Sequence, residues 1–145
     1  MYFFRNLYPS MQAHIGRRHA TVVTGMRRTG KTTLVKQMLA DAPGNNKLYL
    51  DLERIDNRTL FSQENYDNVV RGLSAQGLDF SQKVYLAIDE IQLLPGIVSV
   101  IKYLYDNYDI KFIATGSSSY YLKDLFTESL AGRKKIFELL SLIHI

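Results

Sequence analysis

The stretch HATVVTGMRRTGKTTLVKQMLADA, residues 19–42, decides the fold. It begins with a β-branched apolar run, passes through a loop bounded by glycines, and continues with apolar residues at helical spacing. The pattern predicts a buried strand, a tight loop and a helix in direct succession. This order opens a β-α-β unit and favours a parallel sheet.

The rest of the chain repeats the alternation of strand and helix. We expect further strands at 47–53, 83–92, within 110–119 and at 133–140, and helices at 31–42, 64–77, 93–108 and 119–132, with another around Leu7 and Met11. The first strand lies within 19–25. Five strands alternating with helices predict an α/β fold in which helices cover both faces of a parallel sheet.

Composition limits the protein class. The 145 residues are 46% hydrophobic and 22% charged, which is typical of one folded domain, and the net charge of +4 is too small to identify a partner. No apolar run approaches the ~20 residues that span a bilayer, and the first residues lack the features of a secretion signal. Together with the absence of cysteine, this leads us to expect a cytoplasmic protein without membrane contact.

The loop after the first strand matches the pattern G-x-x-x-x-G-K-[ST] through Gly25, Gly30, Lys31 and Thr32. Backbone N–H groups of such a loop bind phosphate oxygens, and side chains at the two glycines would obstruct their approach. The helix N-terminus adds partial positive charge. The stretch therefore predicts a nucleotide-phosphate site.

The side chains of this loop have separate predicted roles. Lys31 reaches the β- and γ-phosphates, the Thr32 hydroxyl ligates Mg²⁺, and Thr33 contacts the α-phosphate. Arg27 and Arg28 either add charge near the triphosphate or a neighbouring subunit, or face solvent. The residues predicted to bind the nucleotide are Gly25, Arg27, Arg28, Thr29, Gly30, Lys31, Thr32 and Thr33.

An acidic pair ends the strand VYLAIDEIQ, where open α/β sheets bind their ligands. We expect Asp89 to hold Mg²⁺ and Glu90 to act as the catalytic base that activates water. The alternative is a strand that ends in two solvated acids. A third polar group follows in FIATGSSS, where Ser117 is the first candidate to contact the γ-phosphate or the attacking water, and Thr115 and Ser118 are alternatives.

With GMRRTGKTTL, IDEIQ and TGSSS in this order, the chain resembles the AAA+ ATPases, in particular a bacterial and archaeal group with an uncharacterised C-terminal domain. The resemblance implies a three-layer α/β/α P-loop NTPase sandwich with a five-stranded parallel sheet in the order 5-1-4-3-2, and ATP with Mg²⁺ as ligands. It also implies that Ser117 takes the sensor 1 position, and a homo-oligomer is compatible with it, although the oligomeric state stays open. Arg133 is then either an arginine finger toward a neighbouring subunit or a cation at a helix end.

The end of the chain departs from the family pattern because no helical lid follows the fifth strand. We expect the ATPase core to span residues 1–139. The sequence LSLIHI, residues 140–145, is the translation of CTG TCT CTT ATA CAC ATC, a transposase adapter used for sequencing libraries. We therefore expect a non-native tail there; the alternative is that the last strand continues.

The sequence thus predicts ATP binding and Mg²⁺-dependent ATP hydrolysis by Lys31, Glu90, Ser117 and Arg133. Two alternatives stay open: a nucleotide-dependent binding module with little turnover, and a P-loop small-molecule kinase. Neither the work that ATP drives nor a nucleic-acid partner follows from the sequence.

Overall fold

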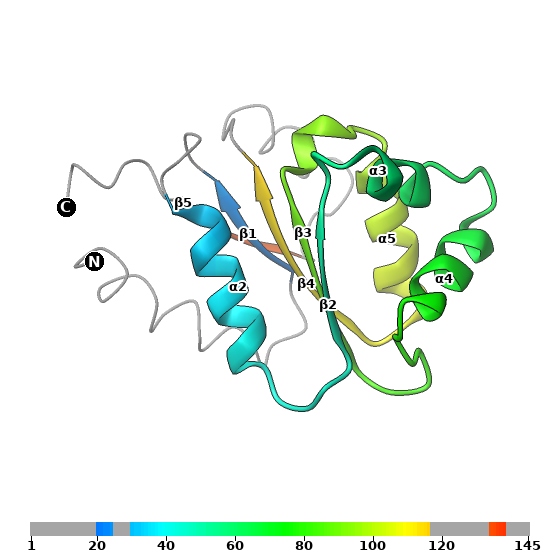
Figure 1. Ribbon diagram of the computed structural model, residues 1–145, viewed down its shortest axis with the longest axis horizontal. Helices are drawn as coiled ribbons and strands as arrows, with labels where there is room; N and C mark the ends of the chain where they lie inside the picture. The colour runs from blue at the N-terminus through cyan, green and yellow to red at the C-terminus, as the bar shows by residue number, and fades with distance from the viewer. Residues whose placement is uncertain (1–19, 25–29, 117–133, 139–145) are drawn as a thin grey trace.

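A computed structural model describes residues 20–24, 30–116 and 134–138 (Figure 1). The strands are β1 (Ala20–Thr24), β2 (Lys47–Asp51), β3 (Val84–Asp89), β4 (Ile110–Gly116) and β5 (Lys134–Glu138). The helices are α2 (Lys31–Asp41), α3 (Ile55–Phe61), α4 (Tyr66–Ala75) and α5 (Ile97–Asn107), with the short 3₁₀ helix η1 (Ile91–Leu93).

The strands form one sheet in the order β2-β3-β4-β1-β5, and every neighbouring pair is parallel. The predicted α/β fold with a parallel sheet is confirmed. The strand β4 separates β1 from β3, so that the order of the first four strands is 1-4-3-2 as expected, and β5 pairs with β1. The carboxyl ends of β1 and β3 therefore open on the same edge.

Helices cover both faces of the sheet (Figure 1). On one face, α2 packs through Leu34, Val35 and Met38 onto Val23 and Ile113. On the other face, α3, α4 and α5 bury a larger aliphatic cluster against Leu86, Ile88, Phe112 and their neighbours. We call these the α2 face and the α5 face.

Every residue of β3 and β4 is buried, because each of these inner strands is covered on both sides. Successive side chains of a strand point to opposite faces. The alternation places Asp89 and Thr115 on the α2 face, together with Lys111 and Thr21, whereas Ile88 and Ala114 lie on the α5 face.

The structure differs from the expected elements at several points: the strand expected at 47–53, for example, ends at Asp51. The helix α3 was not predicted, and β3 ends at Asp89 rather than Gln92 because Glu90 adopts a left-handed backbone conformation (φ 62, ψ 51) that no strand contains. The helices expected around Leu7 and at 119–132, and the tail at 140–145, lie outside the described residues. Among the residues that the structure describes, no helix has the length and apolar character to cross a bilayer.

Candidate functional site

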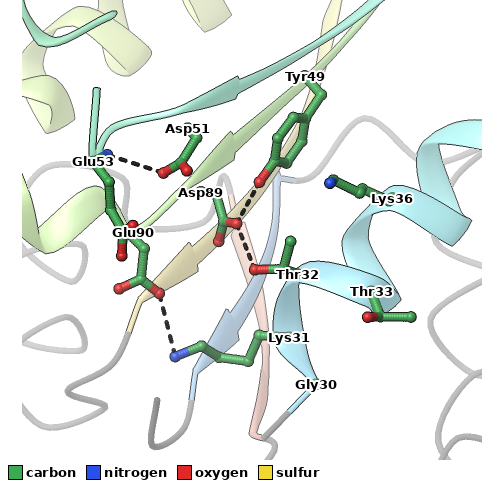
Figure 2. Close-up of a pocket in the computed structure, with 10 residues that line it drawn as sticks. All are labelled: Gly30, Lys31, Thr32, Thr33, Lys36, Tyr49, Asp51, Glu53, Asp89 and Glu90. Atoms are coloured by element: carbon green, nitrogen blue, oxygen red, sulfur yellow. Dashed lines mark hydrogen bonds and ion pairs between the residues drawn. The ribbon is translucent and has the colours of Figure 1, made fainter. Parts of the chain in front are cut away.

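A pocket of ≈ 810 Å³ opens where the N-terminus of α2 meets the carboxyl ends of β2 and β3 (Figure 2). This volume is within the range of small-molecule sites. Its lining is polar and mostly charged, and consists of Gly30, Lys31, Thr32, Thr33, Lys36, Tyr49, Asp51, Glu53, Asp89 and Glu90.

The first turn of α2 supplies the cationic side of the pocket. Gly30 precedes the helix with φ 90, a left-handed conformation that only glycine adopts without strain, and its carbonyl accepts the first helical hydrogen bond from Leu34 N at 3.0 Å. The turn brings Lys31 and Thr32 directly to the carboxyl end of β3. Lys31 is 3% exposed, so its charge is largely withdrawn from water.

Three hydroxyl groups hold the Asp89 carboxylate. Thr32 Oγ1 donates to Asp89 Oδ2 at 2.6 Å, and Tyr49 Oη donates to the same oxygen at 2.5 Å. On the other side, Thr115 Oγ1 donates to Asp89 Oδ1 and accepts a hydrogen bond from Glu90 N at 2.9 Å. Groups from α2, β2 and β4 therefore converge on one buried carboxylate of β3.

Glu90 turns back toward α2 immediately after β3. Its Oε1 lies 3.6 Å from Lys31 Nζ, and its Oε2 accepts a hydrogen bond from Gln92 Nε2 at 2.7 Å. A left-handed conformation is uncommon for a residue with a side chain and is found preferentially at functional sites. Here Thr115 binds the Glu90 N–H, and the Glu90 carbonyl accepts from Leu93 N at 3.1 Å, so that the backbone is held on both sides.

Tyr49 extends from β2 toward Asp89 along the wall of the pocket (Figure 2). Burial raises the pKa of the Tyr49 phenol, and the hydrogen bond to Asp89 raises it further. The hydroxyl therefore stays protonated and acts as a donor. Lys36 Nζ lies 4.9 Å from the centroid of the ring, at a distance typical of a cation–π contact.

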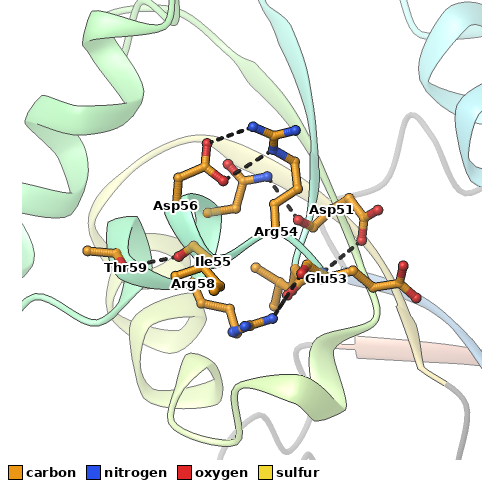
Figure 3. Close-up of polar contacts among 9 residues, drawn as sticks. Asp51, Glu53, Arg54, Ile55, Asp56, Arg58 and Thr59 are labelled. Atoms are coloured by element: carbon orange, nitrogen blue, oxygen red, sulfur yellow. Dashed lines mark hydrogen bonds and ion pairs between the residues drawn. The ribbon is translucent and has the colours of Figure 1, made fainter.

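The turn between β2 and α3 (Figure 3) carries two more carboxylates that line the pocket, those of Asp51 and Glu53. The Asp51 side chain accepts from Glu53 N at 2.9 Å, and the Asp51 carbonyl accepts from Asn57 Nδ2 at 2.9 Å. Arg58 Nη1 donates to the carbonyls of Leu52 at 2.6 Å and Glu53 at 3.2 Å. Side chains of α3 thereby fix the turn that carries Asp51 and Glu53.

The oxygen atoms of Asp89 and of the neighbouring Thr32 hydroxyl are suitable ligands for a magnesium ion. Mg²⁺ prefers hard oxygen ligands and retains coordinated water, so one or two protein oxygens are enough when phosphate supplies the rest. The Thr32 hydroxyl and the Asp89 carboxylate provide such oxygens at the helix N-terminus. Within the described ranges, no cluster of three or more histidine or acidic side chains is arranged to hold a metal by itself.

The structure brings several predicted site residues into this one pocket. Lys31, Thr32, Thr33, Asp89 and Glu90 all line it, with Gly30 at its base. Thr115 binds Asp89 and Glu90 N, and is therefore placed to position them. The other predicted residues lie outside the described residues: Gly25, Arg27, Arg28, Thr29, Ser117, Ser118 and Arg133.

Sequence reasoning missed Tyr49, Lys36, Asp51 and Glu53, which also line the pocket. Tyr49 lies in an alternating strand, where an aromatic residue is usually interpreted as part of the core. What places these residues at the site is the register of β2 and β3, which the sequence does not contain: Asp51 pairs with Asp89, so Tyr49 and Asp51 lie on the face that carries Asp89.

Three comparisons place the chain among known proteins. It is 25% identical over 117 residues to an uncharacterized protein of Haemophilus influenzae, an alignment that covers 77% of this chain and 28% of the relative. The chain thus spans less than a third of the length of that curated relative.

Solved structures share the fold at low sequence identity. A chain in the structure of Drosophila ORC bound to DNA has a TM-score of 0.66 and 10% identity, covering 97% of this chain and 91% of that chain. A chain in the structure of C. elegans PCH-2 has a TM-score of 0.59 and 16% identity, covering 97% and 40%. These similarities support the fold.

The family model described as AAA domain matches residues 17–144. The match includes the loop before α2, the acidic end of β3 and the whole of the sheet. The chain therefore belongs to the AAA domain family, as the order of its motifs predicted.

Proposed function

We propose that this chain binds ATP and hydrolyses it with the help of Mg²⁺. The observation that carries the proposal is the meeting of Lys31 and Thr32 from α2 with Asp89 and Glu90 from β3 in one pocket. Phosphoryl transfer needs a cation for the phosphates, oxygen ligands for Mg²⁺ and a group that activates water. All three kinds of group line the pocket.

On the binding side, Lys31 neutralises phosphate oxygens, and the N–H groups at the start of α2 add partial positive charge. Thr32 and Asp89 hold Mg²⁺, which when bound offsets negative charge on the phosphates. Among the residues that the structure describes, four carboxylates and two lysines line the pocket. Repulsion between these carboxylates and the phosphates is reduced by the divalent cation, so nucleotide binding should depend on it.

For hydrolysis, Glu90 accepts a proton from water as the water oxygen attacks the γ-phosphorus and the bond to the ADP oxygen breaks. The carboxylate is anchored through Gln92 on Oε2, while Lys31 lies near Oε1. When Lys31 engages the phosphates instead, Oε1 becomes available to water. Glu90 therefore acts as a base only after the substrate has bound.

The test compares Glu90→Gln with the unmodified chain, because glutamine keeps the shape and loses the base. We expect turnover to fall by about 10²–10⁴-fold, the range for loss of general-base catalysis, while Mg²⁺-dependent ATP binding persists. Glu64→Gln, at an exposed acid outside the pocket, is the matched control and retains turnover. Equal turnover in all three chains would refute the role of Glu90.

A nucleotide-dependent binding module with little turnover is the second candidate, and the Lys31–Glu90 pair at 3.6 Å favours it. An ion pair that persists after ATP binds would keep the base occupied. The same assay separates the two functions, because a binding module shows ATP binding and no turnover that depends on Glu90.

Assembly with further chains is part of the proposal and rests on family membership. Arg133 then acts on the ATP of a neighbouring copy. The similar Drosophila structure is of ORC bound to DNA, and nucleic acid is therefore a partner to test here. Sedimentation with and without a non-hydrolysable ATP analogue measures assembly, and Arg133→Ala tests whether this residue contributes to it. The same experiment with added DNA measures nucleic-acid binding.

A further inference from the structure

The hydrogen bond between Tyr49 and Asp89 joins β2 to the proposed magnesium site. Tyr49 Oη lies 2.5 Å from Asp89 Oδ2, the oxygen that also accepts from Thr32 at 2.6 Å. In the register of β2 and β3, Tyr49 is paired with Ala87, two residues before Asp89. The small alanine side chain leaves room for the ring to extend forward to the carboxylate.

The Tyr49 ring is held in this position from two sides. It packs against the buried cluster of the α2 face, which contains Ala87 and Leu34. Lys36, one turn after Thr32 on α2, lies over the ring with Nζ 4.9 Å from its centroid. The ring is therefore fixed relative to both the helix and the strand that supply the proposed magnesium ligands.

The donors around Asp89 limit how its carboxylate can meet a cation. A carboxylate offers about four lone-pair positions, two on each oxygen. Thr32 and Tyr49 together occupy those of Oδ2, and Thr115 occupies one on Oδ1. With Tyr49 in place, Oδ2 is directed to hydroxyl groups, and the carboxylate cannot rotate without losing one of these bonds.

We propose that Tyr49 is a positioning residue that fixes Asp89 beside Thr32 and thereby makes the site prefer Mg²⁺ over Ca²⁺; this rests on the proposed Mg²⁺-nucleotide site. Mg²⁺ is small and requires nearly ideal octahedral geometry, whereas Ca²⁺ accepts six to eight oxygens in flexible arrangements. A carboxylate that is held rigidly therefore favours Mg²⁺, whereas a carboxylate that is free to rotate favours Ca²⁺.

The experiment measures binding of a non-hydrolysable ATP analogue by calorimetry, first in EDTA and then at increasing Mg²⁺ or Ca²⁺. The variants are Tyr49→Phe, which removes only the hydroxyl, and Tyr85→Phe, a tyrosine of the same sheet face that lines a different cavity. For Tyr49→Phe we expect the half-saturating Mg²⁺ concentration to rise about tenfold, as for other partners that orient metal ligands. The half-saturating Ca²⁺ concentration should change much less, and the affinity for the ATP analogue in EDTA should stay unchanged.

The ratio of the half-saturating Mg²⁺ concentration to the half-saturating Ca²⁺ concentration distinguishes a positioning role of Tyr49 from a general effect on stability. Tyr85→Phe should keep the ratio of the unmodified chain. An unchanged ratio in Tyr49→Phe, or equal shifts for both cations, would overturn the proposal. Tyr49→Met, which also lacks the hydroxyl, provides the same test if the phenylalanine variant fails to fold. Absence of analogue binding by the unmodified chain would overturn the proposed function itself and this inference with it.

Discussion

The two faces of the sheet differ in what they bury. The α5 face buries a cluster of aliphatic and aromatic side chains that includes Leu50, Leu86, Phe112 and Ala114. The α2 face carries buried polar groups at both ends, with Lys111 bound to Thr21 at one end and Asp89 bound to Thr115 at the other. Both faces belong to the same strands and differ only by the alternation of side chains.

The difference teaches that the α5 face serves stability alone, whereas the α2 face combines an apolar cluster with the polar groups of the candidate site. Apolar burial stabilises the fold on the α5 face. Buried polar groups contribute less and must be paired, so their presence on the α2 face indicates another role. Four variants test this division.

The largest expected effect comes from the α5 face. Leu86 is fully buried on β3, and Leu86→Ala should lower the free energy of unfolding by about 2–5 kcal/mol through lost burial and a cavity. The nucleotide affinity of the folded molecules should not change. Urea unfolding combined with calorimetry measures both, and a large loss of affinity would show that the two faces are not independent.

The second prediction concerns Lys111. Burial lowers the pKa of its ammonium group from 10.5 to about 8, and the charge of Lys83 contributes to the decrease. Below pH 8 the lysine is charged in both the folded and the unfolded chain, and the folded state carries the full cost of burying the charge. Between about pH 8 and 10.5 the folded chain loses this proton first, so the free energy of unfolding should rise, on the order of 3 kcal/mol in total.

The control for this pH effect is Lys111→Met, which cannot titrate. Urea unfolding at pH 7.5 and 9.5 should show a larger gain for the unmodified chain than for the variant. Parallel pH curves for the two chains would contradict the shifted pKa.

Thr115→Val makes the α2 face more like the α5 face and tests whether the hydroxyl is needed there. The variant leaves Asp89 Oδ1 and Glu90 N without this partner. We expect a loss of about 1–2 kcal/mol in unfolding free energy, the cost of unsatisfied buried groups. Cation-dependent nucleotide binding should weaken as well. A variant as stable as the parent, with unchanged binding, would show that Thr115 positions neither residue.

The smallest effect is expected for Gln92→Leu, which removes the hydrogen bond to Glu90 Oε2. Loss of about 1 kcal/mol of positioning corresponds to roughly a fivefold fall in turnover, with ATP affinity unchanged. Gln63→Leu, at a half-buried glutamine outside the pocket that donates to the Thr59 carbonyl, is the control. Equal turnover in the Gln92→Leu and Gln63→Leu variants would show that Gln92 does not position Glu90 for the reaction.

Much of the fold was predictable because hydrophobic periodicity reports burial on one or both faces. The inner strands β3 and β4 are apolar along their length, and α2 follows a glycine-bounded loop. The helix α3 was not predictable in this way. Its sequence IDNRTLF is largely polar, and contacts of Asn57 and Arg58 with carbonyls of the preceding turn hold it in place.

The candidate site was predictable where a motif fixes local geometry. Gly30, Lys31 and Thr32 belong to a single motif that joins a loop to a helix. Asp89 is the charged last residue of an otherwise apolar strand. The contribution of Tyr49 depends on the register between β2 and β3, and the left-handed turn at Glu90 depends on its bond to Thr115. Both are long-range relations that one stretch of sequence does not contain.

The central claim is that the polar end of the α2 face is a Mg²⁺-dependent ATP site. The most direct test is calorimetric ATP binding, with and without Mg²⁺, by the unmodified chain, by Lys31→Ala and by Lys102→Ala, an exposed lysine of α5. We predict Mg²⁺-dependent binding that Lys31→Ala weakens by about 10–100-fold, the value of a hydrogen bond to a charged group, and that Lys102→Ala leaves intact. ATP binding that is absent, or that is equal in the two lysine variants, would contradict the account.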